Sequence, residues 1–107
     1  MQVFYYPSAT EDIYGIWTST LEKWGEKQAD EYVLGLYEAA GSLYQKKSLW
    51  RRIPREYVAE TTENIIFFTK YKRHFIFFRE LQNNKIGVIS VLYEGMNIPK
   101  RIREKLI

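Results

Sequence analysis

The chain has 107 residues and a mass of 12.9 kDa, so we expect a single domain over residues 1–107. Hydrophobic residues make up 46% and charged residues 27%, a balance that excludes a disordered chain. The absence of cysteine excludes a disulfide framework and a thiol nucleophile. His74 is the only histidine, which excludes a histidine-rich metal centre, so we expect neither a metal nor a cofactor.

Charge is distributed unevenly along the chain. Residues 1–49 carry four Lys/Arg against seven Asp/Glu, a net of −3, whereas residues 50–107 carry twelve against six, a net of +6. The basic half suggests an acidic partner, a nucleic acid or a protein segment, or a surplus that only keeps the domain soluble. The longest apolar runs have four residues, far from the roughly twenty of a membrane span, and no targeting peptide is visible. We expect a cytoplasmic protein.

The first elements predicted are a strand and a helix. Residues 2–6 are rich in Val, Phe and Tyr, which favour β-structure. Ser8 followed by Glu11 forms the S-x-x-E pattern of a capping box, which predicts the start of the first helix. Apolar residues then recur at three- and four-residue steps and place Trp24 on the buried stripe. Gly25 is expected to end this helix, because glycine adopts the left-handed conformation at no steric cost.

A second helix is expected from about residue 26 to about residue 45, where apolar residues again recur at helical spacing. Two helices joined by a tight glycine turn predict an antiparallel hairpin. From residue 48 to residue 62 no period holds, and we interpret this stretch as a connection with a short strand at residues 57–59.

The remaining chain predicts three strands and a basic helix or tail. We expect strands over residues 64–69, 73–80 and 85–92, with turns at residues 70–72 and 82–84. Asparagines in the second turn tolerate the positive φ that hairpins require. Sequential strands with short turns predict an antiparallel meander. Residues 98–106 have apolar positions every four residues with basic residues between them, as in a short amphipathic helix.

These elements predict an α+β fold. An N-terminal strand and an antiparallel helical hairpin pack on a mostly antiparallel sheet of three to four strands, followed by a short basic C-terminal helix or tail. The apolar face of the hairpin must cover one face of the sheet. The other face is expected to be partly free and available for function.

Few residues point to catalysis. No phosphate-binding glycine loop, nucleophile elbow or metal-ligand spacing occurs. His74 could act as a general base or serve as a structural hydrogen-bonding residue, and strand alternation separates it from Arg79. Arg79 could bind a carboxylate or phosphate, or stack on a ring. Tyr93, after the last strand, could hydrogen-bond or pack.

The turn at residues 70–73 interleaves basic and aromatic side chains, as the sequence Lys-Tyr-Lys-Arg. Such a pattern suits contact with a nucleic-acid backbone, but it is also typical of a solvated hairpin tip.

Four stretches follow a known pattern. Residues 12–17 read DIYGIW and residues 24–32 read WGEKQADEY, and further on residues 74–79 read HFIFFR and residues 91–97 read VLYEGMN. They resemble, in order and spacing, the motifs D-x-x-x-I-W, W-G-x-x-Q-A-x-x-Y, H-(V/I)-(V/I)-F-Y-R and V-L-H-x-x-M-D of the ParE branch of the RelE/ParE toxin superfamily. The resemblance extends over nearly the whole chain.

The chain departs from the family pattern at several positions. The family's histidine after V-L is Tyr93 here, and its aspartate is Asn97. The arginines that the family often carries on the preceding strand fall on Phe67 and Phe68. These departures imply an activity that is reduced or altered relative to the family.

The resemblance implies a toxin of a type II toxin–antitoxin pair, neutralised by a cognate antitoxin of the acidic or ribbon-helix-helix type. ParE-like toxins inhibit DNA gyrase, and RelE-like toxins cut mRNA on the ribosome. RNA-cleaving relatives carry basic residues where this chain has Phe75 and Glu94, so the resemblance favours a gyrase-binding inhibitor over an enzyme. The alternatives are a ribosome-dependent endoribonuclease using His74, Arg79 and Tyr93, and a degenerate toxin that only binds its antitoxin.

Two groups of residues are the expected contact sites. For the target we expect the basic and polar groups of the sheet end and the tail, which are Arg73, His74, Arg79, Tyr93, Met96, Arg101 and Arg103. For the antitoxin we expect exposed aromatic residues of the hairpin, Tyr14 and Tyr37, because aromatic rings dominate interface hot spots. Direct nucleic-acid binding is expected only under the ribonuclease alternative, and no membrane is involved.

Overall fold

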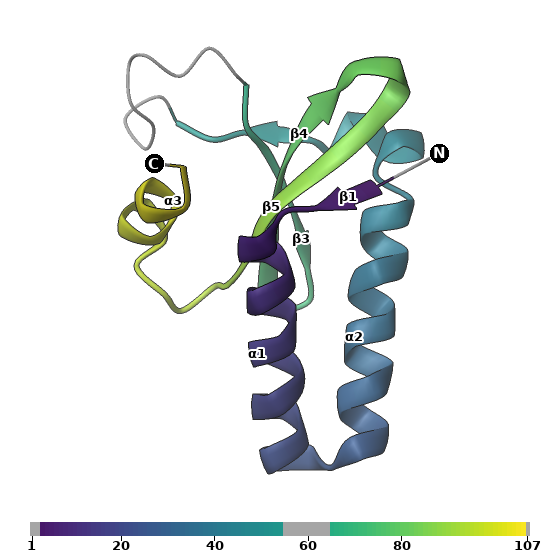
Figure 1. Cartoon of the computed structure of the whole chain (residues 1–107), viewed down its shortest axis with the longest axis vertical. Helices are drawn as coiled ribbons and strands as arrows, with labels where there is room; N and C mark the ends of the chain where they lie inside the picture. Colours follow the sequence, from purple (N-terminus) through teal and green to yellow (C-terminus); the bar gives the residue numbers. More distant parts are fainter. Residues whose placement is uncertain (1–2, 55–64, 107) are drawn as a thin grey trace.

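The structure is a computed structural model that describes residues 3–54 and 65–106 (Figure 1). Its elements are β1 (Val3–Tyr5), α1 (Pro7–Trp24), α2 (Glu26–Gly41), the 3-10 helix η1 (Tyr44–Leu49), β2 (Arg51–Arg52), β3 (Phe67–Tyr71), β4 (His74–Leu81), the 3-10 turn Gln82–Asn84, β5 (Lys85–Tyr93) and α3 (Ile98–Leu106). The strands form one sheet in the order β1-β5-β4-β3-β2. The predicted α+β class is confirmed. Among the described residues, no helix is both long and apolar enough to traverse a bilayer.

Over the part of the chain that the structure describes, the sheet is mixed and has five strands, more than the three to four expected. Strands β3, β4 and β5 form the predicted antiparallel meander, and β1 pairs with β5 in parallel. The additional strand β2 has only two residues, which pair with Phe67 and Phe68, and so short a segment leaves no periodic signal in the sequence. The strand expected at residues 57–59 lies outside the described residues.

The start of α1 differs from the prediction. The helix begins at Pro7, with Tyr6 as the N-cap residue and no side-chain cap, so the expected capping box is not formed. Among the described residues, the Ser8 hydroxyl is buried and finds no hydrogen-bond partner. Proline at the first helical position explains the earlier start, because its fixed φ suits the helix and it has no N–H to be capped. The amide of Thr10 donates to the Tyr6 carbonyl at 3.1 Å.

The hairpin turn forms as predicted, but the second helix is shorter than expected. Gly25 has a φ of 91° and separates α1 from α2. The α-helical part of the second helix ends at Gly41, and the chain continues through the 3-10 helix η1. Here the indole of Trp50 donates to the Leu43 carbonyl at 2.8 Å. This side chain supplies a hydrogen bond at the helix end, where carbonyls otherwise lack intrahelical donors.

The two turns of the predicted meander are present, but the first of them begins later than expected. Strand β3 runs on to Tyr71, so the turn before β4 contains only Lys72 and Arg73, and Lys72 has a φ of 51°. The turn therefore occupies residues 72–73 instead of the expected 70–72. Asn83 and Asn84 have φ values of 61° and 59°, as predicted for asparagine in the second turn.

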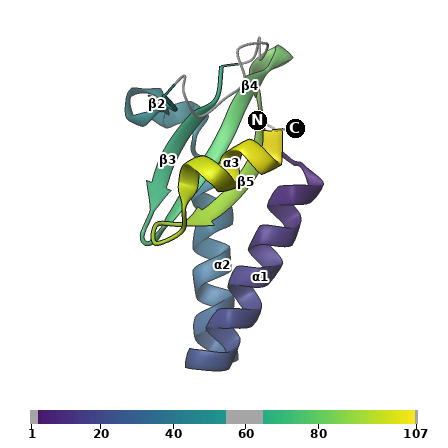
Figure 2. The same ribbon diagram turned by 90° about the vertical axis from the view of Figure 1, so that its left-hand side faces the viewer.

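Helices cover both faces of the sheet (Figures 1 and 2). One core cluster lies between the hairpin and the sheet and includes Ile13, Leu36 and Phe78. The second cluster lies on the other side, where Phe77 and the fully buried Ile102 of α3 pack together. The face that was expected to be partly free is therefore covered by α3, because its apolar side chains need a partner as much as those of the first face do.

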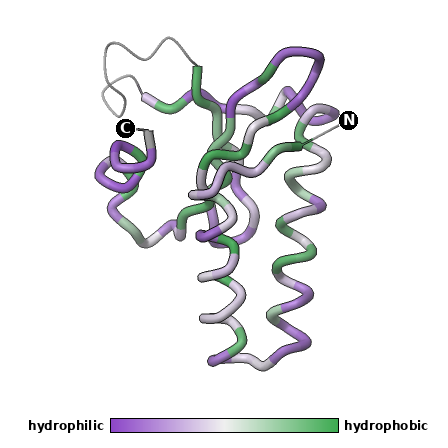
Figure 3. Tube along the Cα trace, viewed as in Figure 1, coloured by the Kyte–Doolittle hydropathy of each residue, from purple (hydrophilic) through white to green (hydrophobic). Residues whose placement is uncertain are grey.

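The turn end of the hairpin projects beyond the sheet. Figure 1 shows the turn end of α1 and α2 extending beyond the ends of the strands, and Figure 3 shows the most hydrophobic segments gathered near the sheet. Trp24, at the end of α1, is 66% exposed, so its predicted place in the core is wrong. Helical periodicity gives the direction of a side chain, but it does not say where along the helix the packing partner ends.

Candidate binding cleft at the sheet end

A cleft of about 870 Å³ lies where the hairpin passes the ends of β4 and β5. Four of the residues expected to contact the target line it, namely Arg73, His74, Tyr93 and Met96. The cleft wall on the helical side includes Tyr32 of α2 and residues of the second half of α1. The hairpin thus forms one side of a concave surface, and the ends of β4 and β5 form the other.

His74 lies at the centre of an aromatic group in this cleft. Its Nδ1 is 2.7 Å from the hydroxyl of Tyr32, and its ring packs edge-on against the rings of Tyr32 and Tyr93, at centroid distances of 5.4 and 5.7 Å. Burial lowers the pKa of His74, against an opposing effect of the nearby carboxylate of Glu94. The imidazole is therefore neutral at pH 7, and the Tyr32 contact leaves Nε2 as the ring nitrogen for other partners.

The basic side chains of the turn beside the cleft form ion pairs and ring contacts within the chain. The Glu94 carboxylate lies 2.6 Å from the ammonium of Lys70 and 3.8 Å from the guanidinium of Arg73. The hydrogen bond from Lys70 holds the pKa of Glu94 below its usual value. The ammonium of Lys72 lies over the rings of Tyr32 and Tyr71, at 5.6 and 5.5 Å. Between the two interpretations of this turn, its internal pairing favours a hairpin tip over a phosphate-binding loop.

Arg79 lies away from the cleft. It is five residues from His74 along β4, or roughly 16 Å at about 3.3 Å per residue. Its Nε donates to the hydroxyl of Tyr6 at 2.8 Å, and its guanidinium lies 5.2 Å from the centre of the Tyr6 ring. The structure brings His74 and Tyr93 together as cross-strand partners, but it does not bring Arg79 to them.

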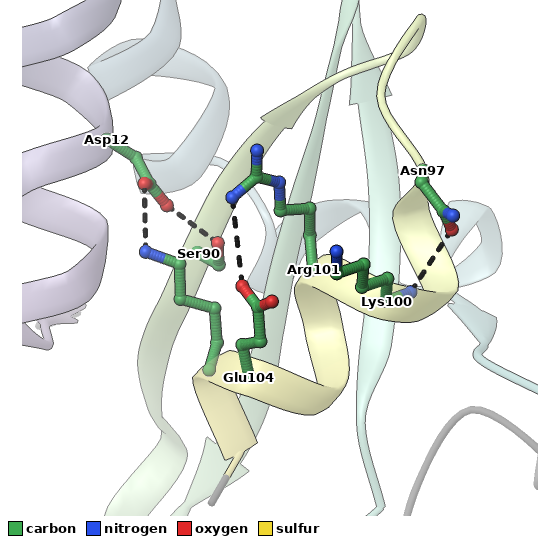
Figure 4. Close-up of polar contacts among 7 residues, drawn as sticks. Asp12, Ser90, Asn97, Lys100, Arg101 and Glu104 are labelled. Carbon is green, nitrogen blue, oxygen red and sulfur yellow. Dashed lines mark hydrogen bonds and ion pairs between the residues drawn. The ribbon is translucent and has the colours of Figure 1, made fainter.

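The other two arginines expected at the target site are on α3. Arg101 and Arg103 are exposed, and Arg101 lies 3.7 Å from Glu104 (Figure 4). The helix is connected to the cleft through Asp12, a cleft-lining residue whose carboxylate accepts a hydrogen bond from Lys105 at 3.3 Å. Asp12 of α1 thus links the two regions that hold most of the expected target residues, the surface of α3 and the cleft.

The two tyrosines expected to contact the antitoxin are on the surface of the hairpin. Tyr14 is 68% exposed and stacks on Trp17, with ring centroids 6.3 Å apart. Tyr37 is 42% exposed and packs edge-on against Tyr5 of β1, at 5.3 Å. Leu34, which is 61% exposed, adds an apolar side chain to the same helix as Tyr37.

Sequence reasoning missed two residues of the site. Tyr32 ends the W-G-x-x-Q-A-x-x-Y motif and was not among the expected site residues, although it forms the hydrogen bond to His74. Asp12 begins the D-x-x-x-I-W motif, and its contacts are to β5 and α3. Their presence in the motifs was the signal that could have indicated both.

Comparisons with known proteins identify the family and the fold of the chain. The sequence profile described as "ParE toxin of type II toxin-antitoxin system, parDE" matches residues 3–98. No curated protein matches the chain. Among solved structures, the chain is similar to one described as "Chromosomal ParDE TA system from P. aeruginosa", with 15% sequence identity and a TM-score of 0.65, over 87% of this chain and 95% of the other. At this identity the structural likeness shows a shared fold. Because the family profile spans most of its length, the chain belongs to the ParE toxin family of type II toxin–antitoxin systems.

Proposed function

We propose that this toxin acts by binding DNA gyrase in the cytoplasm, with the cleft at the sheet end and Arg101 and Arg103 of α3 as its contact surfaces. The observation that carries the proposal is the convergence of Arg73, His74, Tyr93 and Met96 on one cleft. Concave surfaces with aromatic walls and a few polar groups are typical binding sites. Arg79 is not included, because its guanidinium is engaged by Tyr6.

The arrangement of side chains supports binding over RNA cleavage. Metal-free cleavage of RNA requires groups that take a proton, give a proton and stabilise a developing negative charge at one place. Phe75 packs with the second core cluster, and the carboxylate of Glu94 lies beside the cleft. A carboxylate at this place disfavours the phosphate of an RNA backbone.

The antitoxin is proposed to cover the exposed rings of the hairpin. Tyr14 and Tyr37 offer large apolar areas with few rotatable bonds, which is why such residues anchor interfaces. The basic residues of the second half of the chain suit a partner with an acidic segment. The structurally similar protein from P. aeruginosa belongs to a ParDE toxin–antitoxin system, which supports a partner of this kind.

A supercoiling assay with purified gyrase tests the target. We expect the toxin to inhibit supercoiling, and Tyr93→Ala and Arg73→Gln to weaken inhibition while leaving the fold intact. Arg52→Gln serves as the matched control, since it removes an exposed arginine of β2 that does not line the cleft. No inhibition by the wild-type toxin at stoichiometric excess would refute the proposal.

Primer extension on translated mRNA separates the remaining functions. Site-specific cuts would identify a ribonuclease in place of a gyrase inhibitor. Unimpaired growth on full induction, with the antitoxin still bound in a pull-down, would identify a protein that only binds its antitoxin.

A further inference from the structure

We propose that Asp12 is a positioning residue, which fixes α3 against the sheet and so holds the basic surface of that helix in place for the target. The inference rests on the proposed function for its biological consequence, but its structural part can be tested on the toxin alone. One carboxylate connects three elements, α1, β5 and α3 (Figure 4).

Asp12 binds the sheet at the edge of β5, along the part of that edge that β1 does not cover. Strand β1 pairs with only three residues of β5, Ile86, Gly87 and Val88. Past this pairing no further strand of the described residues lies along the same edge of β5, and an unpaired buried amide there would be costly. The Asp12 carboxylate occupies this place, because its Oδ2 accepts hydrogen bonds from the Ser90 hydroxyl at 2.6 Å and from the Val91 amide at 2.9 Å.

The other oxygen of the same carboxylate reaches α3. The Oδ1 of Asp12 lies 3.3 Å from the ammonium of Lys105, near the end of that helix. Both side chains are largely shielded from solvent, with exposed fractions of 14% for Asp12 and 25% for Lys105. A charge-assisted hydrogen bond at such a site is stronger than one at the surface.

Helix α3 depends on its surroundings for stability. A helix of nine residues is too short to be stable by itself in water. Among the described side chains, its apolar contacts come from Ile98 and the fully buried Ile102. Lys105 adds a contact about one turn further on, so the pair with Asp12 holds the C-terminal part of the helix against α1. Arg101 and Glu104 lie on the same turns, and their position in space depends on this anchor.

Hydrogen exchange on the purified toxin tests the anchor directly. Lys105→Glu places a second carboxylate next to Asp12, and we expect the amides of residues 102–105 to exchange roughly tenfold faster or more, the scale of losing a charge-assisted hydrogen bond. The amides of β4 should keep their protection, because the core clusters are unchanged. Lys100→Glu controls for the change in net charge, since it makes the same charge change at an exposed position of α3. The helix dipole acts differently on residues 100 and 105, so the double variant described next isolates the role of Asp12.

The double variant Asp12→Asn/Lys105→Glu tests whether the protection of α3 from hydrogen exchange can be restored. Removing the negative charge at residue 12 relieves the repulsion, so protection of α3 should recover relative to Lys105→Glu alone. In the supercoiling assay Lys105→Glu should require several-fold more toxin than Lys100→Glu does, roughly in proportion to the lost docked fraction. The double variant should again be closer to the control.

The possible outcomes test two claims separately, namely that the contact between Asp12 and Lys105 holds α3 in place and that the toxin binds gyrase. Equal exchange of α3 in Lys105→Glu and Lys100→Glu, or no recovery in the double variant, would overturn the anchor. A loosened α3 with wild-type inhibition of gyrase would overturn the positioning role. If the wild-type toxin fails to inhibit gyrase, the proposed function fails, and the exchange measurements still decide whether Asp12 holds α3.

Discussion

The hydroxyl of Tyr32 and the Nδ1 of His74 are 2.7 Å apart, although 42 positions separate the two residues in the sequence. This contact joins the helical hairpin to the end of the sheet at the floor of the cleft. Burial raises the pKa of Tyr32 and lowers that of His74, so both side chains are held in their neutral forms.

A first prediction concerns the pH dependence of stability. The folded-state pKa of His74 is below its ordinary value of 6.5, so the unfolded chain binds the proton more readily. The contribution of His74 to stability is complete above pH 6.5 and is lost as the pH falls from 6.5 through the folded-state pKa. Urea unfolding between pH 7.5 and pH 5 should show this decline in the wild type.

The variant His74→Gln isolates this effect, since it lacks the titrating ring and keeps a polar side chain. Its free energy of unfolding should change less than that of the wild type over the same pH range. Parallel pH profiles for the two proteins would show that another group is responsible.

A second prediction concerns the close approach of α2 and β3. A methyl group at Gly35 would overlap the phenol of Tyr71, so Gly35→Ala should lower the free energy of unfolding by about 1–3 kcal/mol. Gly15→Ala is the matched control in α1, where the added methyl group meets no atom within 4 Å. That substitution should stabilise the protein by roughly 0.5–1 kcal/mol, through helix propensity. Thermal unfolding of both variants gives the comparison, and the same sign for both would contradict it.

A third prediction assigns Arg79 a structural role. The hydrogen bond from its guanidinium to Tyr6 should give Tyr6→Phe and Arg79→Met a coupling energy of about 1 kcal/mol in a double-mutant cycle. Tyr44→Phe is the control, because its hydroxyl bonds to Asn84 instead, and it should combine additively with Arg79→Met. Inhibition of gyrase per folded molecule should be unchanged in Arg79→Met. A selective loss of inhibition with unchanged stability would return Arg79 to the target site.

A fourth prediction concerns the antitoxin. Tyr14→Ala and Tyr37→Ala should each weaken antitoxin binding by about 1–3 kcal/mol, roughly 5- to 150-fold in the dissociation constant, because the rings offer exposed apolar area. Glu38→Ala, at an exposed position next to Tyr37, should have little effect. Isothermal titration calorimetry measures all three. Unchanged affinity in both tyrosine variants would place the antitoxin elsewhere on the toxin.

Local sequence signals predicted most of the elements. The hairpin, the glycine between its helices, the meander and the C-terminal helix follow from periodicity and turn chemistry, which act over a few residues. The capping box at Ser8 was wrong because proline at the first helical position competes with it over the same short range. Trp24 was assigned to the core because a helical wheel has no information on where the sheet ends.

The sequence by itself therefore determined the family and the α+β class, since these depend on residue types in a fixed order. It also named four residues that line the cleft, as a prediction of the target site. Only the tertiary structure decided which side chains meet across long separations. It pairs Arg79 with Tyr6, joins His74 to Tyr32, and connects Asp12 to both β5 and α3. The physical reason is that such contacts arise from the packing of whole elements, whose lengths and positions no local pattern specifies.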